Sequence, residues 1–75
     1  MRRIGEVVRT AQGLAVLRSP DESYPRLGTE LVDSDLDAVG RVVDVFGPVE
    51  QPYVAVSPAS GVELPILLGE KLYAR

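Results

Sequence analysis

The chain contains no cysteine, no histidine and no tryptophan among its 75 residues. Without cysteine it cannot form a disulfide, and without cysteine and histidine it lacks the usual ligands of a structural zinc ion. The same absences exclude Cys–His and Ser–His–Asp catalytic arrangements. A general acid or base would have to be Asp, Glu, Tyr or the single lysine, Lys71. A metal site would have to be built from oxygen atoms, which suits Ca²⁺ or Mg²⁺.

Positive charge is also scarce. The chain has 8 Lys and Arg residues against 11 Asp and Glu residues, and its formal net charge is −3. A protein that binds nucleic acid by itself usually carries a basic patch and a basic isoelectric point, whereas the sequence pI here is about 4.7. Arg2, Arg3 and Arg9 could form a small cationic spot, but solvated arginines are the simpler interpretation. We therefore expect RNA to be reached only indirectly, through a partner.

Long apolar runs are absent as well. No stretch approaches the roughly 20 residues that span a bilayer, and the opening MRRIGEVVRT lacks the apolar core and cleavage site of a signal peptide. The sequence thus predicts a cytoplasmic protein without membrane contact. Its length predicts a single domain over residues 1–75. Because a domain this small buries only about 60% of its unfolded surface, a partner protein is a plausible source of additional stability.

Short β-branched segments separated by glycine and proline run through the sequence and predict an all-β fold. The last of them is interrupted by Pro65 and Gly69, which argue against a helix there. Short, evenly spaced strands favour a small closed six-stranded antiparallel barrel, because closure removes exposed sheet edges. The expected strands are Ile4–Thr10, Leu14–Arg18, Thr29–Asp33, Gly40–Phe46, Tyr53–Ser57 and one or two within Glu63–Tyr73.

Two of these strands carry apolar residues on both faces. Simple alternation places Val43 and Val45 on one face of the fourth strand, and Tyr53 and Ala55 on one face of the fifth. Since a barrel has one interior, the second apolar face indicates a protein-binding surface. A covering loop or a bulge that reverses the facing would explain the pattern equally well.

The segment GRVVDVFGPVEQPYVAVSP, residues 40–58, resembles the signature of the Gar family of archaeal H/ACA ribonucleoproteins. Phe46-Gly47-Pro48-Val49 followed by Pro52-Tyr53 is the discriminating part. Flanking segments IGEVVRTAQGLAVLR, YPRLGTELVD and GEKLY are also similar, so the resemblance covers nearly the whole chain.

The resemblance implies a six-stranded barrel of the translation-factor/reductase type and a non-catalytic role. Such a subunit binds the catalytic pseudouridine synthase of the H/ACA complex and assists loading and release of substrate rRNA during guide-directed pseudouridylation and ribosome biogenesis. It implies no cofactor, metal or small-molecule substrate. We expect the partner-binding residues to be Val43, Val45, Phe46, Gly47, Pro48, Val49, Pro52 and Tyr53.

Other interpretations remain open at this stage. LGTELVDSDLDAVGRVVDVFG also resembles PRC-barrel domains, which act as binding modules in RNA metabolism and ribosome maturation but lack the Phe-Gly-Pro-Val continuation. Asp33-Ser34-Asp35-Leu36-Asp37 begins like a calcium loop, yet the template's glycine and glutamate positions hold Ala38 and Asp44. A solvated acidic turn is expected instead. Tyr24, with Pro20 and Pro25, is expected to fold back over the core as a lid, and a binding loop is the alternative.

Overall fold

The computed structural model describes residues 2–20 and 22–75; Met1, the first residue of the predicted domain, and Asp21, in the loop after the second strand, lie outside the described residues. Within that range the chain forms six strands and one short 3-10 helix. They are β1 (Arg2–Ala11), β2 (Leu14–Arg18), β3 (Glu30–Val32), β4 (Ala38–Phe46), β5 (Tyr53–Pro58), η1 (Leu64–Leu67) and β6 (Lys71–Ala74).

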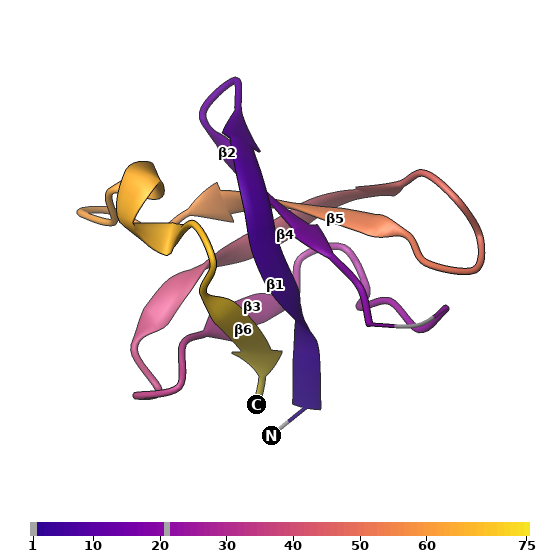
Figure 1. Cartoon of the computed structure of the whole chain (residues 1–75). Helices are drawn as coiled ribbons and strands as arrows, with labels where there is room; N and C mark the ends of the chain where they lie inside the picture. The colour runs from indigo at the N-terminus through magenta and orange to yellow at the C-terminus, as the bar shows by residue number, and fades with distance from the viewer. Residues whose placement is uncertain (1, 21) are drawn as a thin grey trace.

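The strands close into one antiparallel barrel in the order β1-β2-β5-β4-β3-β6. The last strand, β6, lies between β1 and β3, so the two ends of the chain are neighbours in the sheet (Figure 1). The fold predicted from the sequence, an all-β closed barrel, is therefore confirmed.

The segment before β6 differs from the expectation. The predicted strand region Glu63–Tyr73 contains the helix η1 and only one strand. Pro65 stands in the first turn of η1, where a residue without an N–H is tolerated because that donor has no helical partner. Gly69, with φ +83°, follows directly and turns the chain toward β6. The helix places Leu67 in the core.

The barrel interior is filled almost entirely by aliphatic side chains. Leu17, Leu31 and Leu72 are fully buried there, and Leu67 enters from η1. Gly40 lets β4 and β5 cross closely, because a Cβ atom at this position would collide with the carbonyl oxygen of Ser57. The complete interior cluster is Ile4, Val7, Ala15, Leu17, Leu31, Val39, Val42, Val54, Val56, Leu67 and Leu72.

A β-bulge in β4 changes which residues face outward. Val42 pairs with Val56, but the next pair on β5 is Asp44 with Ala55, so Val43 is the extra residue. Val42 is buried in the interior and Val45 packs against the same cluster, whereas Val43 is exposed. The expectation that Val43 and Val45 share a face was wrong. The bulge adds one residue to β4 and so interrupts the alternation of inward-facing and outward-facing side chains.

Candidate protein-docking surface

The hairpin that joins β4 to β5 extends from the barrel on the side away from η1 (Figure 1). Its turn is tightened by a hydrogen bond from Gln51 N to Pro48 O at 3.3 Å. Two contacts anchor it to the end of β2: Ser19 N donates to Pro52 O at 3.0 Å, and the Arg18 guanidinium donates to Gln51 Oε1 at 2.7 Å. The hairpin is thus held in place by the chain itself.

An aromatic pair lies on the outer face of this hairpin. Phe46 and Tyr53 are register partners, and their rings stack with centroids 5.6 Å apart at 27°. Gly47, with φ +91°, packs against Tyr53, because a Cβ atom there would meet Cδ2 of the ring at 2.8 Å. Such aromatic pairs contribute about 0.5–1.5 kcal/mol beyond the area that they bury. The stack therefore gives the hairpin a fixed shape.

Arg9 covers part of the outer face. It is the register partner of Val16 on β2, and its Cζ atom lies 6.0 Å from the centroid of the Tyr53 ring on β5, so its side chain crosses over β2. Val16 and Ala55, also partners, are both buried although alternation points them away from the interior cluster. Ala55, expected on the exposed apolar face, is therefore covered by this chain's own side chains.

A groove remains exposed beside the hairpin. It has a volume of about 290 Å³. Val49 is 82% exposed and Phe46 is 38% exposed. Six of the eight residues predicted from the sequence line it: Val45, Phe46, Gly47, Pro48, Val49 and Pro52. The structure thus brings together most of the predicted partner-binding residues on one hollow surface.

The other wall of the groove comes from a loop for which the sequence favoured a core lid over a binding role. Glu22 and Tyr24, from the loop between β2 and β3, line it together with the hairpin. The expectation that Tyr24 covers the core was wrong, because its side chain is 62% exposed while the adjacent Pro25 is buried. An aromatic residue between two prolines in a long loop was the available signal, since stiff loops often present binding residues.

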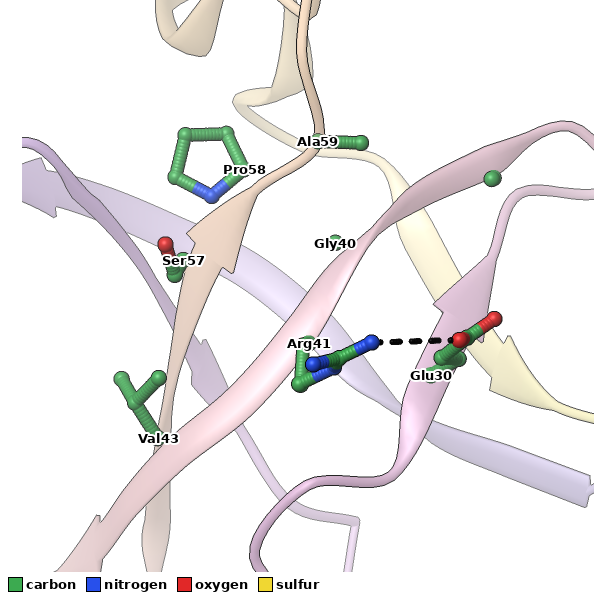
Figure 2. A pocket seen from close by; sticks show the side chains of 8 residues that line it. Glu30, Gly40, Arg41, Val43, Ser57, Pro58 and Ala59 are labelled. Atoms are coloured by element: carbon green, nitrogen blue, oxygen red, sulfur yellow. Dashed lines mark hydrogen bonds and ion pairs between the residues drawn. The ribbon is translucent and has the colours of Figure 1, made fainter.

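Val43 lies elsewhere, in a second hollow of about 450 Å³ on the outer face of β3, β4 and β5 (Figure 2). One side of it carries Arg41 and Glu30, whose side chains form an ion pair at 3.3 Å. Both are largely exposed, so the pair adds little stability. The hollow is lined by Glu30, Ala38, Gly40, Arg41, Val43, Ser57, Pro58 and Ala59. Tyr53 does not line either of these two hollows. It supports the groove beside the hairpin indirectly, because its ring stacks on Phe46.

The charged groups considered from the sequence are dispersed. Arg2 and Arg3 line a small hollow with Tyr24, while Arg9 lies over Tyr53, so the three arginines do not gather in one place. Asp33, Asp35 and Asp37 do approach one another. Asp33 Oδ1 accepts hydrogen bonds from Asp35 N at 2.9 Å and Asp37 N at 3.1 Å. These bonds are those of an aspartate that stabilises its own turn.

The closed topology and the exposed hairpin define a small β-barrel module. Among solved structures it resembles the Gar1 domain of Naf1, with a TM-score of 0.73 and 14% identity over 99% of this chain and 81% of that chain. The model of the family described as the Gar1/Naf1 RNA binding region matches residues 1–75. The chain belongs to this family, which confirms the resemblance to Gar proteins and disfavours the PRC-barrel alternative.

Curated relatives are similar at moderate identity. The H/ACA ribonucleoprotein complex subunit GAR1 of Chaetomium globosum is 27% identical over 71 residues, covering 93% of this chain and 34% of that protein. An uncharacterised protein of the archaeon Methanothermobacter thermautotrophicus is 26% identical over 76 residues, covering 97% of this chain and 82% of that protein. The chain thus spans about a third of the fungal subunit. Over the described residues, no helix has the length and apolar character to cross a membrane.

Proposed function

We propose that this chain is a non-catalytic protein subunit of an H/ACA ribonucleoprotein and that it binds the catalytic pseudouridine synthase subunit. Family membership over residues 1–75 supports the class of complex, as does similarity to a protein named as an H/ACA subunit. We place this role in the cytoplasm, in rRNA processing and ribosome biogenesis, with RNA reached through the complex.

The observation that carries the docking proposal is the exposed apolar hairpin. Val49 is 82% exposed at its tip and lines the groove together with Phe46 and Pro48. Exposed apolar groups on a rigid, pre-organised element are typical of interfaces, because little conformational entropy is lost when they bind. Tyr53 lies beside them, and its ring stacks on that of Phe46.

The proposed mechanism is positional. By binding the synthase beside a mobile loop that holds substrate RNA, the subunit would favour one state of that loop over another. A bound protein shifts such an equilibrium only to the extent that it contacts the two states differently. The subunit would thereby assist loading and release of rRNA without taking part in the chemical step.

A direct test is binding to the purified synthase subunit, measured by calorimetry. Replacing Val49 by Asp should weaken binding at least about tenfold, because a charge would have to be desolvated in an apolar contact. The matched control is Ile66→Asp, since Ile66 is 70% exposed but belongs to η1 on the other side of the barrel. The control should bind like the original chain.

Two results would contradict the proposal. Equal affinities for Val49→Asp and the original chain would exclude the hairpin as the docking surface. Pseudouridine formation by the isolated chain, in the absence of any other protein, would show that it is not a non-catalytic subunit. Circular dichroism of each variant would establish that the barrel is intact.

A further inference from the structure

The groove beside the β4–β5 hairpin has two walls from distant parts of the chain. The hairpin supplies one, and Glu22 with Tyr24 supplies the other. The loop that carries the second wall is tied to the hairpin at both ends. Ser19 N donates to Pro52 O at 3.0 Å, and Gly28 N donates to Val42 O at 2.7 Å. Both ends of the loop that carries Glu22 and Tyr24 are therefore attached to β4 and to the hairpin.

Most of the residues that line the groove are apolar, and its volume is small. About 290 Å³ lies at the lower end of the range of about 300–1,000 Å³ found for small-molecule pockets. The space suits one or two side chains of a partner better than a whole helix. Tyr24 is a suitable contact for such a group, because tyrosine offers a large rigid surface at a low entropic cost.

The charge of the groove is negative. Glu22 is the one charged side chain among the described residues that line it, and the hairpin turn adds an exposed carboxylate, Glu50. Among the described residues no arginine lines the groove. Arg18 is hydrogen-bonded to Gln51, and Arg2 and Arg3 line a separate hollow that shares Tyr24. An approaching cation would thus meet Glu22 without a competing arginine in the groove.

We infer that the groove receives an apolar side chain of the synthase flanked by an arginine or lysine. The apolar group enters between Tyr24 and the hairpin, and the cation pairs with Glu22. This inference rests on the proposed function, but it assigns the second wall to the interface and states the chemistry of the segment that binds. Arginine suits this place well, since it is enriched at protein interfaces and pairs with a carboxylate in a bidentate manner.

The charge part of the inference is tested by the salt dependence of binding to the synthase subunit. At an ionic strength of about 0.1 M the Debye length is about 10 Å, and at about 1 M it is about 3 Å. Glu22→Gln should weaken binding about threefold at low salt and Glu22→Lys about tenfold, with both differences shrinking at high salt. The control is Glu63→Lys, which changes the net charge equally but lies at the start of η1. It should leave the affinity and its salt dependence unchanged.

The apolar part is tested by Tyr24→Ala, with Leu27→Ala as its control. Leu27 is in the same loop and is 66% exposed, but it does not line the groove. Tyr24→Ala should weaken binding at least about tenfold at both salt concentrations, as expected for an aromatic anchor. Leu27→Ala should bind normally.

The outcomes separate this inference from the proposed function. If Glu22→Lys behaves like Glu63→Lys, or Tyr24→Ala like Leu27→Ala, while Val49→Asp remains defective, the second wall is not part of the interface and only the inference is overturned. If the original chain does not bind the synthase, both fail. Loss of binding by Glu22→Lys and Tyr24→Ala, with both controls intact, supports the inference.

Discussion

Replacing Gly47 by alanine should impair both the stability of the barrel and its docking. Gly47 has φ +91°, a backbone conformation that an L residue adopts at a cost of about 1–2 kcal/mol. In addition, the new Cβ atom would lie 2.8 Å from Cδ2 of Tyr53, so the ring would have to move. Moving it disturbs the stack with Phe46, which is worth about 0.5–1.5 kcal/mol. The two effects together predict a loss of about 1.5–3.5 kcal/mol in the free energy of unfolding.

The structure offers a control that isolates the second effect. Gly61 has φ +85°, and apart from its chain neighbours no heavy atom of the described residues would lie within 4 Å of a Cβ atom at this position. Gly61→Ala should therefore show the backbone strain alone, about 1–2 kcal/mol. The difference between the two variants measures the contact between position 47 and the Tyr53 ring. Urea denaturation of both proteins, monitored by circular dichroism, gives these free energies.

A double-mutant cycle with Tyr53→Ala tests the assignment. With the ring removed, Gly47→Ala should cost no more than Gly61→Ala, which gives a coupling energy of about 1 kcal/mol. Synthase binding should weaken in Gly47→Ala and not in Gly61→Ala. If the two single variants lose equal stability and the cycle shows no coupling, the reasoning that the aromatic stack shapes the hairpin is refuted.

Four further substitutions test three other features by the same denaturation experiment. Arg9→Ala should lower stability by about 1 kcal/mol, because it removes the cation over Tyr53 and uncovers outer apolar surface; an unchanged stability would contradict this covering role. Val45→Glu should be strongly destabilising, by about 3 kcal/mol or more, and Val43→Glu by less than about 1 kcal/mol; similar losses would argue against the bulge. The buried hydroxyl of Ser19 has no hydrogen-bond partner among the described residues, so Ser19→Ala should be neutral or stabilising, and a clear loss would indicate a partner.

The strands and their closure into a barrel were predictable because local composition determines them. β-Branched residues separated by glycine and proline mark five of the strands closely, and a chain of 75 residues has few ways to hide all the edges of its sheet. The segment with Pro65 was less predictable. Proline disfavours a helix interior but not a first turn, and the sequence alone does not show which of these positions it takes.

The docking surface was predictable only in part, and the reasons are geometric. The Phe46–Tyr53 hairpin carries a recognisable motif, but a bulge leaves no compositional mark. The bulge decides which valine of the segment Val42-Val43-Asp44-Val45 faces outward. The sequence of this segment would be the same whether or not the bulge were present. The second wall depends on a tertiary contact that brings Tyr24 beside residues more than twenty positions away, and no local pattern encodes that distance.

The order of the strands has a consequence for synthesis of the protein. Since β6 fills the place between β1 and β3, the barrel cannot close until residues 71–74 have left the ribosome. Until then the nascent chain exposes two unpaired strand edges, on β1 and β3, and such edges are the features most prone to aggregation with other chains. The barrel can therefore close only after β6 has been synthesised, however early the other five strands pair.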